Sequence, residues 1–306
     1  MSTPGSATFG DLINRVKALL YGFTWDQEQY TYLTNSIGAT DVTMSVNDAT
    51  QISRGLVEID QELINVQSVN STNNTCTIFP FGRGFYGSTA ATHTANTAII
   101  NNSKFPIIRC MDAINDIINE VYPQLFVIGE YEFPKVAVQY NYPLPANIDQ
   151  VLEVHYQTIG PSLIWPPMRR WRFDPVASVD SGTALGTTGK SIECLEEVTP
   201  GRTIKVTYVT RPTTLVNLTD GFAAVTGLPE SSKDAIIYGA AAKLLVVYDA
   251  ARLQMDSVES SERAALTQPT SASNSSKYFM GIYENRLDLE AKKLRDLYPS
   301  YGVQSS

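Results

Sequence analysis

The sequence is poor in residues that hold metals or form disulfides. Three cysteines and two histidines occur among 306 residues. Cys76, Cys110 and Cys194 lie far apart, so they offer neither the short spacing of a zinc site nor an even set for a disulfide framework. We therefore expect no metal and no cofactor, and we expect reduced thiols, as in a protein made in a cytosol.

Long apolar runs and positive charge are scarce as well. No stretch of about 18 uninterrupted apolar residues occurs, which predicts no transmembrane helix, and the N-terminal segment lacks the pattern of a signal peptide. The 23 Lys and Arg residues are outnumbered by 31 Asp and Glu residues, for a net charge of −8. This balance argues against a dedicated DNA-binding protein, because phosphates require a basic face. A negative surface still lets DNA slide past without sticking.

The sequence also lacks the common catalytic motifs. The sequence has no nucleophile elbow, no phosphate-binding loop, no HExxH and no Asp-rich calcium loop. Residues 82–87 spell GxGxxG, but no apolar helix follows and no acid lies between Glu62 and Asp112, so a glycine-rich turn in a β module is the better interpretation. His93 and His155 each lack a second ligand at metal spacing. The sequence therefore predicts that the protein is not an enzyme.

Four segments have the apolar spacing of amphipathic helices. They are residues 8–23, 103–122, 229–255 and 277–298. Thr8 and Asp11 can form a capping box for the first, and Ser103 is the expected N-cap of the second, which Pro123 closes. Residues 239–242 of the third are small and would let another helix approach closely. The apolar seam of the second helix comprises Ile107, Met111, Ile114, Ile118 and Val121.

Two regions between these helices have the alternating pattern of β-strands. The first is rich in Thr, Ser, Asn, Val and Ile, and Asp60-Gln61 is flanked by two strands that predict a hairpin. The second is cut into short pieces by prolines and contains a loop rich in Gly and Thr. The expected strands are 42–46, 56–59, 63–66, 75–78, 135–140, 151–155 and 203–209.

These elements predict an α+β fold. No helix can bury its apolar stripe alone, so the economical arrangement is a four-helix core assembled from separated segments. Two β-rich insertions, each a small barrel or sandwich, would project from this core. The expected parts are an N-terminal helix (1–30), an inserted β module (31–102), a core helix (103–128), a second β-rich insertion (129–220), and a C-terminal helix pair with a tail (221–306).

Residues 168–173 form the most basic and aromatic stretch of the chain. As a strand, this stretch would place Arg169, Trp171 and Phe173 on one face, a candidate interface. Contact with a protein partner is one interpretation, and stacking on a nucleic-acid base is another. The third is an edge strand whose solvated arginines prevent unwanted pairing.

The C-terminal segment, residues 297–306, carries no charged side chain. A free tail is one interpretation. The other is a tail that becomes ordered on a partner, because aromatic side chains there could anchor it. The candidate anchoring residues are Leu297, Tyr298, Pro299 and Tyr301.

Two parts of the sequence resemble components of tailed-bacteriophage particles. Residues 228–245, followed after a polar gap by 278–294, are similar to the helical pair of head-to-tail connector (adaptor) proteins, and the helix at 103–122 fits the same bundle. Residues 33–46, 55–64 and 82–93 resemble a small β module that recurs in phage virion proteins. Together the resemblance covers about half of the chain.

The resemblance to connectors implies a homo-oligomeric ring below the portal protein, usually of about twelve subunits. Helices would form the ring wall, and DNA would pass through the channel without sequence-specific binding. The protein would lie in the neck of the virion after assembly in the host cytoplasm, with the portal and neighbouring neck or tail proteins as partners and with no membrane contact. By position, residues 297–306 would contact the portal.

Two other functions stay open at this point. The β module also suits a tail-terminator, tail-tube or baseplate component. The alternative from a different class is a glycan-binding or glycan-cleaving receptor protein, because exposed aromatic rings on β modules can bind sugars. Its candidate sugar contacts are Trp165, Trp171 and Tyr140.

Overall fold

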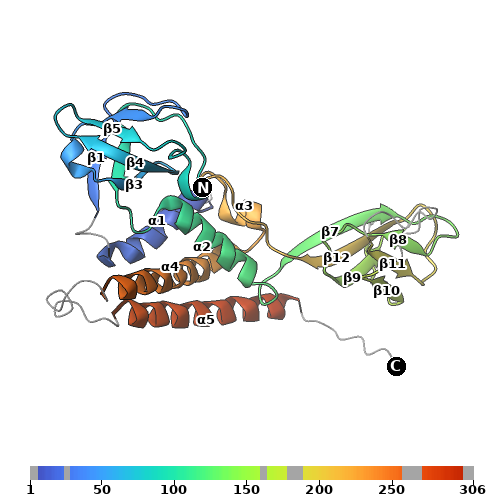
Figure 1. The fold of residues 1–306 in the computed structure, drawn as a ribbon. Coiled ribbons are helices and arrows are strands. Elements are labelled where there is room, and N and C mark those ends of the chain that lie inside the picture. Colours follow the sequence, from blue (N-terminus) through green and yellow to red (C-terminus); the bar gives the residue numbers. More distant parts are fainter. Residues whose placement is uncertain (1–5, 24–27, 159–163, 178–188, 257–270, 299–306) are drawn as a thin grey trace, which may run out of the picture. The chain divides into compact units, whose positions relative to one another are not determined.

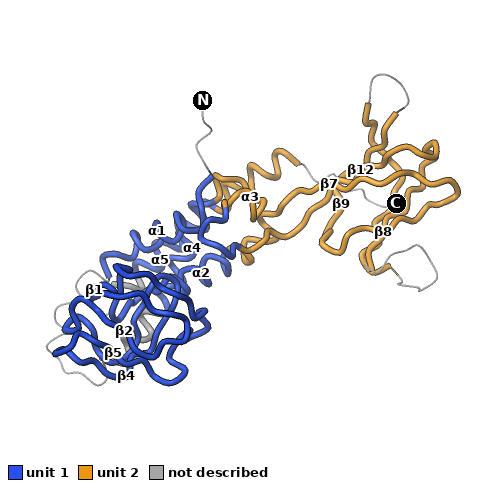
Figure 2. The backbone as a smooth tube through the Cα atoms, turned by 90° about the horizontal axis from the view of Figure 1, so that it is seen from above, with its two compact units in different colours: residues 1–117, 215–220, 233–286 blue, residues 118–214, 221–232, 287–306 orange. Residues whose placement is uncertain are grey.

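The computed structural model describes residues 6–23, 28–158, 164–177, 189–256 and 271–298. In these ranges the chain has a mixed α+β fold of five α-helices and three antiparallel sheets (Figure 1). It divides into two compact units (Figure 2). The first unit contains residues 1–117, 215–220 and 233–286, and the second contains 118–214, 221–232 and 287–306. Each unit thus combines segments that are far apart in the sequence.

Helix α1 (Phe9–Leu20) begins at the capping box that the sequence predicts. The N–H of Asp11 donates to the Thr8 hydroxyl (3.2 Å), and the Asp11 carboxylate accepts from the N–H of Thr8 (2.9 Å). One face is buried and comprises Phe9, Leu12, Ile13, Val16 and Leu20. A single 3₁₀ turn, Tyr21–Phe23, ends this segment.

The first unit contains a six-stranded sheet that curves into a half-barrel (Figure 1). Its strands are β1 (Gln29–Tyr32), β2 (Thr43–Ser45), β3 (Gly55–Ile59), β4 (Glu62–Asn70), β5 (Thr75–Ile78) and β6 (Ala98–Asn101), in the order β1-β6-β3-β4-β5-β2. The two edge strands meet just beyond their ends, where Leu33 pairs with Val46. The predicted hairpin is present, and Asp60 turns it with a φ of 53°. Inward-facing apolar side chains, among them Val57, Ile59, Ile64 and Ile99, fill the interior.

Helix α2 (Ile107–Glu120) begins four residues later than the sequence suggests, so Ser103 as N-cap was wrong. The N–H of Ile107 donates instead to the carboxylate of Glu58 in β3 (2.5 Å). The N–H of Lys104 donates to Glu28 (3.1 Å). Both acceptors come from the half-barrel, so no local pattern indicates them. The buried face is also broader than the expected seam: Cys110, Ala113, Ile114, Ile117, Ile118 and Val121 are buried, whereas Ile107 and Met111 are half-buried.

Helix α4 (Lys233–Asp256) contacts three other helices within the first unit. Asp234 forms an ion pair with Arg15 of α1 (3.8 Å), and Lys243 forms one with Asp116 of α2 (3.6 Å). Helix α5 (Ser271–Leu297), which starts six residues earlier than expected, lies beside α4 (Figure 1). There the hydroxyl of Ser276 donates to a backbone carbonyl of α4 (3.0 Å).

The small residues of α4 permit the close approach that the sequence predicts. A Cβ atom at Gly239 would lie 3.1 Å from Ile117 of α2 and 3.0 Å from Tyr283 of α5. Any larger residue would therefore push one of these helices away. Ala240, Ala241 and Ala242, which follow Gly239, are buried as well.

The chain also returns to the helices of the first unit after its second β region. Two hydrogen bonds of 2.9 Å join the side-chain amide of Asn115 in α2 to the backbone of Leu215. The N–H of Phe9 donates to the carbonyl of Asp220 (2.8 Å). The segment 215–220 is therefore attached to both α1 and α2.

Two three-stranded sheets form the β part of the second unit. One consists of β7 (Val127–Pro134), β12 (Thr203–Thr210) and β9 (Gln150–Tyr156), and the other of β10 (Trp171–Asp174), β11 (Ser191–Cys194) and β8 (Asn141–Pro143). They share one apolar core, which includes Tyr142, Val154, Ile192 and Val206. A short helix, α3 (Phe222–Thr226), belongs to the same unit.

The strands expected at 151–155 and 203–209 lie within β9 and β12, but the strand expected at 135–140 was wrong. These residues form the loop between β7 and β8. Val138 has a φ of 67°, which an extended strand cannot contain. Val136 and Val138 are 48% and 92% exposed, so the apolar alternation does not mark a buried face here.

None of the described helices combines the length and the apolar character needed to cross a membrane.

Candidate functional site

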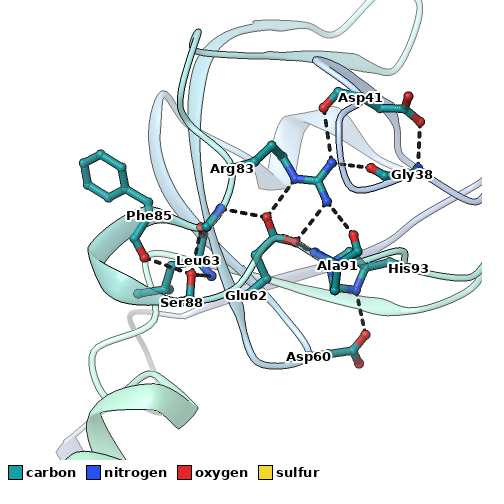
Figure 3. A network of polar contacts seen from close by, with 11 residues as sticks. Gly38, Asp41, Asp60, Glu62, Leu63, Arg83, Phe85, Ser88, Ala91 and His93 are labelled. Atoms are coloured by element: carbon teal, nitrogen blue, oxygen red, sulfur yellow. Dashed lines mark hydrogen bonds and ion pairs between the residues drawn. The ribbon is translucent and has the colours of Figure 1, made fainter.

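Five hydrogen bonds converge on the carboxylate of Glu62 in the half-barrel (Figure 3). Arg83 donates two of them, through Nε (2.8 Å) and Nη2 (2.9 Å). The backbone N–H groups of Gly84 (2.9 Å) and Ala91 (3.0 Å) donate two more. The fifth comes from Nε2 of His93 at 2.8 Å. These residues and Asp60 are called the Glu62 network below.

Arg83 extends the network to the neighbouring loop. Its Nη1 donates to the carbonyls of Gly38 and Asp41, and its Nη2 donates to the carbonyl of Ala91 (2.6 Å). The side chain is 8% exposed. Arg83 therefore fastens two loops to the β3–β4 hairpin, which supplies Glu62.

His93 bridges two carboxylates. Its Nδ1 lies 2.8 Å from Asp60, and its Nε2 lies 2.8 Å from Glu62. Both ring nitrogens therefore lie within hydrogen-bonding distance of a carboxylate. The ring is 2% exposed, and the sequence indicated neither of its two carboxylate partners.

The Glu62 carboxylate is held in its ionised form. Burial alone would raise the pKa of Glu62, but the hydrogen bonds from Arg83, Ala91, His93 and Gly84 outweigh it and lower that pKa to about 2. Both carboxylate oxygens are occupied by protein donors. The geometry is that of a structural clamp, because a substrate would have to displace these donors.

The glycine motif at 82–87 belongs to this clamp. Gly84 has a φ of 60° and Gly87 a φ of 83°, and a Cβ atom at Gly82 would lie 2.7 Å from the carbonyl oxygen of Asn65. Only a single 3₁₀ turn, Phe85–Gly87, follows the first two glycines. A dinucleotide site needs a full helix there, so the glycine-rich turn is the structure that the sequence predicts.

The candidate interface strand is β10, which lies at the edge of the sheet formed by β10, β11 and β8. Strand β10 begins at Trp171, so Arg169 precedes the strand instead of sharing its face, and the N–H of Arg169 donates to Glu196 (2.8 Å). Trp171 and Phe173 are half-buried and pack against the core, whereas Arg172 is exposed. Contact of this strand with a partner stays a prediction.

The candidate portal contact lies at the end of helix α5. Leu297 is 72% exposed and Tyr298 is 40% exposed. Pro299 and Tyr301 lie outside the described residues. Binding of the portal by this segment stays a prediction.

The candidate sugar contacts do not form one aromatic platform. Lys205 Nζ lies 4.8 Å from the ring centre of Trp165, so the ammonium group covers one face of that ring. Trp171 packs against the core. Tyr140 is 54% exposed, and Lys135 Nζ lies 5.0 Å from its ring centre.

Two loops of the second unit form an exposed apolar surface that the sequence did not indicate. The N–H of Cys194 donates to the carbonyl of Tyr140 (2.8 Å), which places the β7–β8 loop beside the loop after β11. The side chains of Val136, Val138, Tyr140 and Leu195 are 48%, 92%, 54% and 46% exposed. These four residues are called the apolar tip below.

The apolar tip is held by the residues beneath it. The Tyr142 hydroxyl accepts from the N–H of Val136 (3.0 Å), and its own hydrogen faces the carbonyl of Gln139 (3.0 Å). Lys135 Nζ donates to the same carbonyl (2.5 Å) and lies over the rings of Tyr140 and Tyr142. The loop thus has a defined shape, although its apolar side chains point to solvent.

The three cysteines are buried, and burial raises the pKa of each thiol: to about 11 for Cys76, 12 for Cys110 and 11 for Cys194. Among the described residues, no group of three or more His, Cys, Asp or Glu side chains is arranged to hold a metal ion.

A scan against models of protein families found no match to this chain, and a search of curated proteins found none either.

Proposed function

We propose that the chain is a structural subunit of a tailed-bacteriophage particle: a head-to-tail connector whose copies form a ring between portal and tail and leave a channel for DNA. One observation carries this proposal. Helices from separated parts of the chain contact α4, and the β regions are inserted between these helices in the sequence.

The path of the chain supports a four-helix core. The chain leaves the helices after α1, forms the half-barrel, and returns in α2. It leaves again for the second β region and returns through the segment 215–220, which is bonded to α1 and α2. Helix α4 then contacts α1, α2 and α5. The resemblance to connectors implies the pair of α4 and α5 and a place for α2 in the same bundle.

The attachment of the half-barrel to α1 and α2 also suits a subunit that must withstand mechanical force. Glu58 of β3 is 2% exposed, accepts the first N–H of α2 and lies 3.5 Å from Lys17 of α1. An anionic group at a helix N-terminus is favourable because the helix dipole is positive there. The half-barrel is therefore joined to two helices by a buried charged group, and a force on the half-barrel would be passed to the core.

The mechanism of such a protein is mechanical. Head-to-tail contacts between identical copies close into a ring when the rotation between neighbours permits it. A net charge of −8 per copy suits a channel that DNA must traverse without binding, because negative charge repels phosphate.

The proposal is tested by the state of the purified chain. Light scattering should give a mass several times that of one chain, and negative-stain electron microscopy should show rings. Mixed with phage heads that carry a portal, the protein should add density at the portal vertex. A chain that stays monomeric at high concentration and ignores such heads would overturn the proposal.

A further inference from the structure

We infer that neighbouring subunits of the ring contact each other through the apolar tip of one copy and the outward face of helix α5 of the next. This inference rests on the proposed function, because it names the two surfaces that would join copies in the ring. The charges around each surface support it.

The apolar tip borders a hollow whose solvent-facing charge is negative. The hollow measures about 400 Å³, and its lining includes Val136, Val138, Tyr140, Glu196, Glu197 and Val198. Lys135 also lines it, but this side chain is 7% exposed and its ammonium is occupied by a carbonyl and two tyrosine rings. Arg170, near Leu195, donates to that residue's carbonyl. A complementary surface is therefore apolar with positive charge around it.

Val138 gives this surface the character of a contact site. It is a β-branched residue with a φ of 67°, a conformation in which such residues are outliers. Its side chain is 92% exposed, so packing within the chain gives no reason for a valine. Strain of this kind persists where the surrounding structure imposes it, and it concentrates at binding sites. The bonds of Tyr142 and Lys135 fix the loop in advance, which lowers the entropy cost of docking.

Helix α5 offers the complementary surface. Leu289 is 55% exposed. Its neighbours on the helix surface, three and four residues away in each direction, are Asn285, Arg286, Lys292 and Lys293. Lys293 is bonded to Glu290 (2.6 Å), whereas Arg286 and Lys292 form no ion pair within the part of the chain that the structure describes. Leu289 is thus an apolar side chain with cations around it, and it suits an apolar hollow with an acidic rim.

Two different surfaces on one chain generate the type of contact that a ring needs. A tip-to-α5 contact is heterologous, so each copy binds one neighbour with its tip and the other with its helix. A tip-to-tip contact would instead pair Glu196 and Glu197 with their own copies, and like charges oppose that arrangement.

A charge exchange tests the inference on the full-length chain. Glu197→Lys and Lys292→Glu, made separately, should each raise the concentration needed for ring formation about tenfold or more, as light scattering would show. The two changes in one chain should restore assembly to within about threefold of the unaltered protein. Glu284→Lys and Lys277→Glu are matched controls, because they alter the same charges on α5 away from Leu289 and should leave assembly unchanged.

Disulfide crosslinking tests the same contact independently. All three native thiols are buried, so Val138→Cys together with Leu289→Cys introduces the reactive pair. On mild oxidation the double variant should form a ladder of covalent oligomers, whereas either single variant should stay a covalent monomer, because the facing surface of its neighbour carries no thiol. Rings that form normally in every charge variant, with no ladder, would overturn the inference and leave the proposed function standing. An unaltered chain that never forms rings would remove the proposed function itself.

Discussion

At Glu62, one buried carboxylate compensates the buried guanidinium of Arg83 and also contacts the buried ring of His93. Arg83 and His93 are 8% and 2% exposed, and both donate to Glu62, which is 1% exposed. A buried ion pair is costly to break from one side, because the partner is left as an uncompensated charge. The loops around the β3–β4 hairpin therefore depend on the Glu62 carboxylate for their attachment.

Glu62→Gln is expected to lower the free energy of unfolding by about 3 kcal/mol. The amide would turn an N–H₂ group towards N–H donors and would leave Arg83 without an anion, whereas His93 would keep its contact with Asp60. Urea unfolding at neutral pH measures this loss. Asp60→Asn is the control: Asp60 is 60% exposed, so its loss should cost less than about 1 kcal/mol. Equal effects of the two substitutions would contradict the role given to Glu62.

The same carboxylate should produce an acid-dependent loss of stability. The pKa of Glu62 falls from 4.5 to about 2 in the folded protein. A lowered folded pKa contributes stability that is fully present above about pH 4.5 and is lost as the pH falls towards 2. The stability difference between the unaltered chain and Glu62→Gln should therefore shrink from pH 6 to pH 3 in urea unfolding. A difference that stays constant over this range would count against the assignment.

Val138 carries strain that a substitution can release. Asn adopts positive φ more readily than a β-branched residue, so Val138→Asn should raise the free energy of unfolding by about 1 kcal/mol. It should at the same time weaken ring formation, because the apolar contact is lost. Val136→Asn removes a comparable exposed side chain without relieving a positive φ and should not stabilise the fold. A destabilised Val138→Asn chain would show that the loop conformation is not strained.

The start of helix α2 is determined by a residue that lies outside the helix. The first N–H of α2 is bonded to Glu58 of the half-barrel. Glu58→Ala should therefore cost about 1–2 kcal/mol and should speed hydrogen exchange at the first turn of α2 more than at its middle. Ser103→Ala should change neither quantity. If Ser103→Ala had the larger effect, the helix would be capped locally after all.

The elements that the sequence predicted well are those whose signal is local. The capping box of α1 and the hairpin around Asp60 each depend on residues within a few positions, and the close packing at Gly239 is indicated by the small residues that follow it. Strands β1 and β6 were not predicted. In β1, exposed Tyr30 and Tyr32 flank the one buried residue, Thr31, so the strand gives no apolar alternation.

The candidate sites were harder to predict than the fold. Glu62, Arg83 and His93 are separated by 10 to 31 residues, so no local pattern in the sequence groups them. The loop at 135–140 was misread because alternating valines favour a strand, whereas the bonds of Tyr142 and Lys135 impose a turn. Contacts of this kind exist only after distant segments meet.

At the scale of the whole molecule, the chain combines three features: helices that meet on α4, β regions inserted between helices, and an acidic composition with a preformed apolar tip. Hydrogen bonds that cross long stretches of sequence attach the segment 215–220 to α2, such as those of Asn115 with Leu215.

The most direct test of the central claim is the mass of the purified full-length chain, measured by light scattering over a range of concentrations and followed by electron microscopy of the same sample. The account predicts one discrete oligomer with a ring-shaped image and a central opening. A single monomer peak at every concentration, with no rings in the presence of portal-bearing heads, would contradict it.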